Sequence, residues 1–165
     1  MKFIFLDIDG VLNCTTTTER HKGMIGIEDE KLQLLKEIVS ATGAKIILTS
    51  TWKTDWFPDV PEEDLPSDGK YLNKKFAKYG LHIMAKTEDE CWGKRGEGIL
   101  RFMGNLARPV TSYVILDDER FDYIELGMDK NLVKTQFVPM YEGQECGLHK
   151  YHVEKAINIL NGVRE

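Results

Sequence analysis

Several short segments of this chain are apolar over most of their length instead of at every second residue. Strands with this pattern are buried on both faces, as in parallel sheets covered by helices. Segments with apolar residues at helical spacing alternate with them. The predicted strands are residues 2–7, 44–50, 81–85, 112–118 and 132–137, and the predicted helices are residues 28–42, 70–80, 95–107 and 148–162. This alternation predicts an α/β fold: a three-layer, Rossmann-like parallel sheet of about five strands with helices on both faces.

The length of 165 residues suits a single domain that covers residues 1–165. The least regular segment is residues 51–70, which contain three of the five prolines and two of the three tryptophans. We expect this segment to be an ordered loop over one rim of the sheet. We also expect residues 51–93 to form no more than a small lid or insert.

Composition narrows the classes of partner and location. The net charge of −5 gives no general attraction to nucleic acid, so any contact with a polynucleotide must be local. No apolar run approaches the roughly 20 residues of a membrane span, and the N-terminus does not resemble a secretory signal. We therefore expect a cytoplasmic protein without a membrane partner. Because Cys14, Cys91 and Cys146 are odd in number and widely spaced, we also expect reduced thiols.

Three predicted strands end in polar residues. These are Asp7 with Asp9, Thr49 with Ser50, and Asp117 with Asp118. The carboxyl ends of parallel strands line one crevice, where ligands usually bind in such sheets. Carboxylates cost free energy when they are buried together, so a cation is expected between them. A cluster of oxygen ligands suits Mg²⁺, which commonly shares its coordination shell with phosphate oxygens.

These segments resemble the motifs of the haloacid dehalogenase (HAD) superfamily. "DIDGVLN" resembles the first motif, "IILTS" the second and "VILDD" the acidic fourth, while "GKRGEGI" holds candidates for the lone cation of the third motif. The segments "LTSTW", "RGEGIL" and "YVILDDE" are similar to a narrower branch, the HAD domain of Swiss Army Knife RNA repair proteins. The resemblance implies a HAD-like fold with a minimal cap, because the intervals between motifs are too short for a full cap domain.

The resemblance also implies residue roles. Asp7 would attack phosphorus and form an aspartyl phosphate, and Asp9 would act as general acid and base. Mg²⁺ would be held by Asp7, by the backbone carbonyl of Asp9 and by Asp117, with Asp118 in support.

Phosphate binding is implied for a second set of residues. Thr49 and Ser50 would hold phosphoryl oxygens, and Gly10 would let the chain turn sharply beside them. Arg95 is the preferred candidate for the charge-balancing cation, and Lys94 is the alternative.

The resulting hypothesis is a Mg²⁺-dependent phosphomonoesterase, with a nucleic-acid phosphate end as one candidate substrate. Two alternatives remain open at this point. One is a phosphatase for a small nucleotide or sugar phosphate, and the other is a non-catalytic phosphate-binding or interaction module. Trp52, Trp56 and Phe57 are expected to pack in the core or rim, and the functional alternative for them is a stacking platform for a base.

Overall fold

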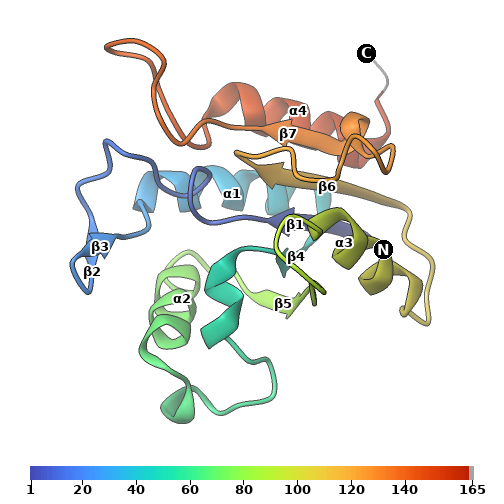
Figure 1. Ribbon diagram of the computed structural model, residues 1–165, viewed down its shortest axis with the longest axis horizontal. Coiled ribbons are helices and arrows are strands. Elements are labelled where there is room, and N and C mark those ends of the chain that lie inside the picture. The colour runs from blue at the N-terminus through green and yellow to red at the C-terminus, as the bar shows by residue number, and fades with distance from the viewer. Residues whose placement is uncertain (164–165) are drawn as a thin grey trace.

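The structure is a computed structural model that describes residues 1–163. Its main feature is a parallel sheet with helices on both faces (Figure 1). The strand order is β5-β4-β1-β6-β7, and every neighbouring pair is parallel. The strands are β1 (Lys2–Leu6), β4 (Lys45–Leu48), β5 (Ile83–Lys86), β6 (Ser112–Asp117) and β7 (Leu132–Lys134). The predicted α/β class and its five parallel strands are confirmed. Residues 164–165 of the predicted domain lie outside the described residues.

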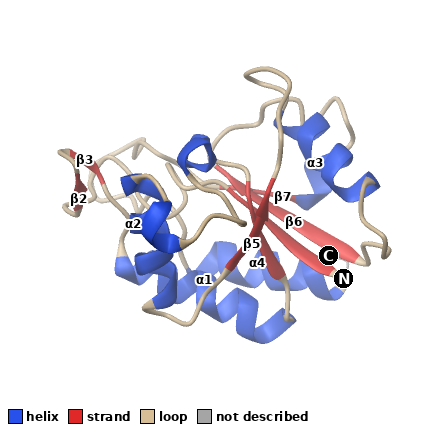
Figure 2. Ribbon diagram, turned by 90° about the horizontal axis from the view of Figure 1, so that it is seen from below, coloured by secondary structure: helices blue, strands red, loops and turns tan. Residues whose placement is uncertain are grey.

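Four helices cover the sheet: α1 (Asp29–Thr42), α2 (Ser67–Ala77), α3 (Arg95–Gly104) and α4 (Lys150–Asn161). Figure 2 shows α1 and α4 on one side of the strands and α3 on the other. All four correspond to predicted helices. The start of α2 is earlier than predicted, because Pro66 stands directly before the first turn and fixes an extended entry to the helix.

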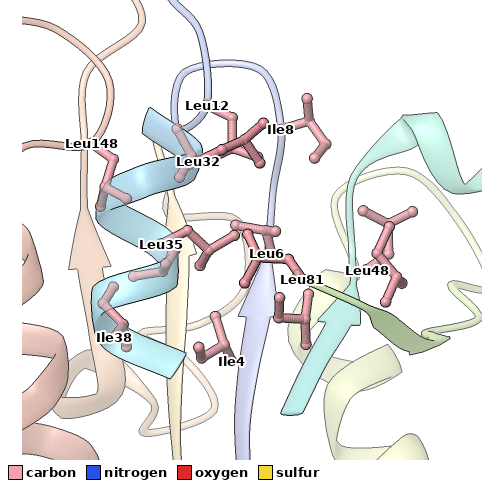
Figure 3. Packing of buried hydrophobic residues seen from close by; sticks show 14 of the residues in the cluster. Ile4, Leu6, Ile8, Leu12, Leu32, Leu35, Ile38, Leu48, Leu81 and Leu148 are labelled. Carbon is pink, nitrogen blue, oxygen red and sulfur yellow. The ribbon is translucent and has the colours of Figure 1, made fainter. Parts of the chain in front are cut away.

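The alternating side chains of β1 fill two separate cores. Ile4 and Leu6 face the larger core with α1, α2 and α4, whereas Phe3 and Phe5 face the smaller core with α3. In Figure 3 the helix α1 directs Leu32, Leu35 and Ile38 toward this strand. Each such side chain, when fully buried, contributes roughly 1.5–3 kcal/mol. The strand therefore needs apolar residues at its four buried positions, from Phe3 to Leu6.

A small hairpin, which the sequence analysis did not predict, follows β1. Its antiparallel strands are β2 (Arg20–His21) and β3 (Met24–Ile25). The turn between them uses Lys22 and Gly23, both with positive φ (50° and 78°), as the tightest hairpin turns require. Strands of two residues are too short to show an alternating pattern, and this explains why the hairpin was missed.

Residues 51–70 form two short 3₁₀ helices, η1 (Thr51–Asp55) and η2 (Glu62–Asp64), before α2; a third, η3 (Asp129–Asn131), precedes β7. Trp56 is buried, and its indole Nε1–H donates to Asn73 Oδ1 at 2.9 Å, so this tryptophan has the expected packing role. Gly69 permits α2 to approach η1 closely, because a Cβ atom there would lie 2.4 Å from the carbonyl oxygen of Asp55.

The expectation of reduced thiols is wrong for two of the three cysteines. Cys14 and Cys146 form a disulfide across 132 residues of sequence, with their Cα atoms 5.9 Å apart. The segments meet because the loop after β1 bonds to the segment after β7, for example from Thr15 N to the carbonyl oxygen of Phe137 (3.0 Å). Sequence spacing does not reveal such a meeting. The cysteines therefore no longer argue for a reducing compartment.

Cys91, the third cysteine, is exposed and unpaired.

Within residues 1–163, no helix has the length and apolar character needed to cross a membrane.

Asp29 joins the first turn of α1 to α2. Its carboxylate accepts from Lys75 Nζ at 2.6 Å and also from Lys78 Nζ, and these bonds lower its pKa from 3.8 to about 2. We expect Asp29→Asn to lower the free energy of unfolding by about 1 kcal/mol at pH 7, a modest loss because solvent screens this partly exposed carboxylate. The pKa of Asp29 is lower in the folded state than in the unfolded state, so its stabilising effect is lost as the carboxylate becomes protonated. The difference in stability between the wild type and Asp29→Asn should therefore shrink as pH falls from about 4 to about 2.

Urea denaturation at several pH values measures this difference. Glu30→Gln, which removes an exposed acid from the same turn, is the matched control and should change stability little. An equal loss in both variants would show that helix-terminus charge, and not the link to α2, is responsible.

Candidate active site

The carboxyl ends of β1, β4 and β6 lie side by side because β1 pairs with both neighbours. Two backbone bonds extend this pairing past the strands: Asp7 N donates to the carbonyl oxygen of Leu116, and Thr49 N donates to that of Leu6, both at 2.9 Å. Asp7, Thr49 and Asp117 are consequently brought to the same end of the sheet.

Asp7, Asp117 and Asp118 form a compact acidic cluster. One oxygen from each carboxylate lies within 4.8 Å of the others. Asp7 and Asp117 are buried and Asp118 is half-buried. Burial raises the pKa of all three, and the charge of Asp7 raises the pKa of Asp117 and Asp118 further, that of Asp118 to about 6. Such a group is costly unless positive charge stands beside it.

Arg95, the first residue of α3, supplies positive charge. Its Nη1 lies 2.8 Å from Asp117 Oδ2 and 3.1 Å from Asp7 Oδ2. Burial opposes its charge, but the two carboxylates raise its pKa above the usual value. The guanidinium carbon lies 4.3 Å from the centre of the Phe121 ring, in cation–π contact. Lys94, in contrast, is exposed and pairs with Glu97 at 2.9 Å.

The loop after β6 prepares this position for Arg95. Asp122 accepts from the backbone N–H groups of Gly96 and Glu97 (2.7 and 3.1 Å), so it satisfies donors at the start of α3. Tyr123 donates its hydroxyl to Asp117 Oδ2 at 2.8 Å. Neither residue was predicted, since each lies beyond the fourth motif in a segment without regular structure.

Asp9 lies outside the acidic cluster, and its carboxylate is held by two donors. Asn13 Nδ2 lies 2.9 Å from Oδ1, and the indole Nε1 of Trp52 lies 3.0 Å from Oδ2. Trp52 was considered only for packing or stacking, and Asn13 was given no role. The signal for Asn13 was present in "DIDGVLN", where a polar residue ends a turn that also receives the N–H of Gly10 (3.0 Å to Asn13 Oδ1).

Gly10 is needed for a close approach. Its φ is +82°, and a Cβ atom there would lie 2.3 Å from Cγ of Asp118. Its carbonyl oxygen accepts from Thr135 Oγ1 at 2.5 Å, which joins the first loop to the end of β7. A glycine at this position therefore allows the loop to pack directly against the acidic cluster.

Thr49 and Ser50 are both fully buried. Within the described residues, Thr49 Oγ1 has no hydrogen-bond partner, although a buried hydroxyl normally has one. Ser50 Oγ accepts weakly from Trp52 N at 3.4 Å, and the Ser50 side chain acts to lower the pKa of Asp7, although burial outweighs it. An unpartnered hydroxyl beside a buried arginine and a carboxylate cluster fits a ligand with acceptor oxygens.

Lys53 is a further cation near the site that sequence analysis missed. It lies in η1, just after the second motif, and its Nζ donates to Asp89 Oδ2 (2.6 Å) and Thr87 Oγ1 (3.1 Å). Burial lowers its pKa, and so does the charge of Arg95. A lysine within "TSTWK" gave no signal, because isolated lysines are mostly solvated.

The ligand atoms of Asp7, Asp117 and Asp118 can be compared with those that metal ions prefer. The cluster consists of carboxylate oxygens alone, and it holds more negative charge than Arg95 offsets. Mg²⁺ and similar hard cations prefer such ligands, so the residues fit a divalent cation.

The family described as "HAD domain in Swiss Army Knife RNA repair proteins" matches residues 3–140, from β1 to the segment beyond β7. The chain belongs to this family. The resemblance inferred from the motifs is therefore confirmed, at the level of both the HAD superfamily and its RNA-repair branch. No curated protein and no solved structure matches the chain.

The close approach at Gly10 gives a testable consequence for this HAD domain. We expect Gly10→Ala to lower the free energy of unfolding by about 2–4 kcal/mol, since it combines a positive φ with overpacking against Asp118. Chemical denaturation measures the loss. Gly23→Ala is the control, because Gly23 has a similar φ of +78° but no atom within 4 Å of the new Cβ; it should cost about 1 kcal/mol. Equal losses would contradict the close packing.

Proposed function

We propose that the protein is a Mg²⁺-dependent phosphomonoesterase that acts through an aspartyl phosphate on Asp7. One observation carries the proposal: Asp7 shares the edge of the sheet with Asp117, Asp118 and Arg95, while the unpartnered hydroxyl of Thr49 lies buried at the same edge. Membership of a HAD family supports phosphoryl chemistry for this constellation.

Asp7 is the nucleophile. One of its carboxylate oxygens forms a bond to phosphorus as the bond from phosphorus to the leaving oxygen breaks, and the electron pair of that bond goes to the leaving oxygen. In the second step a water oxygen attacks the same phosphorus, and the bond to Asp7 breaks. The buried surroundings of Asp7 exclude competing water and strengthen electrostatic interactions with the phosphoryl group.

Asp9 is the general acid and then the general base. It gives a proton to the leaving oxygen in the first step and takes one from the attacking water in the second. Asn13 and Trp52 hold its two oxygens, so the carboxyl group is oriented before substrate binds. Each oxygen retains a lone pair for the proton.

Arg95, Thr49 and Ser50 bind the phosphoryl oxygens. The guanidinium of Arg95 balances charge that develops in the transition state, and the Thr49 hydroxyl and Ser50 amide donate to equatorial oxygens. Gly10, with its φ of +82°, lets the loop turn sharply beside them. Mg²⁺, held by Asp7, the Asp9 carbonyl and Asp117 with Asp118 in support, would reduce the repulsion between Asp7 and an anionic substrate.

We propose a nucleic-acid phosphate end as the substrate, on the strength of the family description. Residues 1–165 would act as one domain, with residues 51–93 as its small lid. A phosphatase for small nucleotides or sugar phosphates is the alternative within the same chemistry.

The first test is phosphate release with Mg²⁺ and with chelator, on 5′- and 3′-phosphorylated oligonucleotides, mononucleotides, sugar phosphates and a phosphopeptide. We expect Mg²⁺-dependent release, and we expect Asp7→Asn to lower it by more than about 10³-fold and to abolish phosphoenzyme. Asp129→Asn, a change in exposed η3, is the control and should retain full activity. If no substrate is hydrolysed with any metal, the non-catalytic phosphate-binding module is the better account.

A second prediction separates the two candidate cations. Arg95→Gln should lower kcat by about 10²–10³-fold, because a positive charge beside Asp7 is lost, whereas Lys94→Gln should leave kcat unchanged. Circular dichroism and thermal unfolding check that each variant folds. Loss of activity in Lys94→Gln alone would assign the role to Lys94 instead.

A further inference from the structure

A pocket of about 490 Å³ opens beside Asp9, and the mechanism so far does not use it. Its walls come from the β2–β3 hairpin, from η1 and from Phe137 after β7. The volume lies within the range of small-molecule sites. Because Asp9 itself lines the pocket, a leaving oxygen protonated by Asp9 would be attached to whatever the pocket holds.

Aromatic side chains in this pocket are fixed from more than one side. The Trp52 ring is anchored by the bond from its Nε1 to Asp9 (3.0 Å). The His21 ring stacks on Tyr71, with centroids 4.1 Å apart and planes inclined by 14°, and its Nε2 lies 2.8 Å from Asp68 Oδ1. Rings held in this way bind a planar ligand with little further loss of side-chain freedom.

The charge of the pocket disfavours an anionic group deep inside it. Lys22, the lysine of its lining, already pairs with Asp68 at 2.8 Å. Asp9 and Asp55 add carboxylates to the wall. The Asp55 carboxylate can accept a hydrogen bond from an N–H group of a nucleobase. Sugar hydroxyls can donate in the same way, so it is the planar aromatic wall that favours a base over a sugar. Met24 and Phe137 supply apolar contact at the edges.

We propose that this pocket is the leaving-group subsite and that it accepts the base of a terminal or free nucleoside. The inference rests on the proposed function, which it extends by assigning the base of the substrate to a defined subsite. The phosphate lies at Asp7, the ester oxygen at Asp9, and the uncharged ring lies against Trp52 and the hairpin residues that line the pocket. Any further phosphodiester of a polynucleotide remains outside the pocket, in solvent.

Binding without chemistry is the first experiment. In ¹H–¹⁵N spectra recorded with chelator, we expect adenosine to shift the indole N–H signal of Trp52 in a saturable way, and we expect ribose not to do so. Met24→Ala should weaken adenosine binding by about tenfold, the scale of a lost apolar contact in a pocket. Met140→Ala is the matched control, an equally exposed methionine (77% against 72%) outside the pocket. No shift with adenosine, or equal shifts with ribose, would overturn the subsite.

Kinetics with Mg²⁺ keep this inference separate from the proposed function. Glycerol phosphate has no base, so its hydrolysis tests phosphatase activity alone. If neither glycerol phosphate nor any other substrate is hydrolysed, only the proposed function is overturned. If activity is present, kcat/KM for adenosine 5′-phosphate should exceed that for glycerol phosphate by at least about tenfold, and Met24→Ala should reduce this preference. Equal values would overturn the subsite. A 5′-phosphorylated oligonucleotide shows whether the base belongs to a polynucleotide end or to a free nucleotide. A kcat/KM above that of the mononucleotide supports a polynucleotide end, and a kcat/KM below it supports a free nucleotide.

Discussion

Two buried carboxylates, on Asp7 and Asp117, share the single guanidinium of Arg95, and the surrounding structure meets the cost of this arrangement. A buried ion pair gains from attraction only where its geometry is good and its remaining atoms are hydrogen-bonded. Both conditions are met here: Ile8 N donates to Asp7, Glu119 N and Tyr123 donate to Asp117, and the Phe121 ring covers the guanidinium. The sheet supplies the two acids, while the start of α3 supplies the cation.

The loop after β6 connects these parts. Asp122 compensates the N-terminal N–H groups of α3, where a cation such as Arg95 is otherwise disfavoured by the helix dipole. The same loop carries Phe121 and Tyr123 to the guanidinium and to Asp117. A single irregular segment thus orients the helix, the arginine and one acid of the cluster.

A second set of contacts fixes the position of Asp9. Asn13 and Trp52 hold its carboxylate, and the residue after Asn13 is Cys14, whose disulfide with Cys146 ties the first loop to the segment beyond β7. Trp52 also faces the pocket of the β2–β3 hairpin. Trp52 therefore contributes both to the site proposed for proton transfer and to the subsite proposed for the leaving group. Because of this shared residue, a ligand in the pocket can affect the orientation of Asp9.

The sequence by itself determined the order of strands and helices, and it marked Asp7, Thr49 and Asp117 as polar residues at strand ends, because these features depend on local periodicity and on the common direction of parallel strands. It did not determine the partners of those residues. The bonds of Asn13 and Trp52 to Asp9, of Tyr123 to Asp117, of Arg95 to Asp7 and Asp117, and between Cys14 and Cys146 join residues that the sequence analysis did not pair. Only tertiary packing decided them, since spacing along the chain carries no information about distance between segments that meet across the sheet edge.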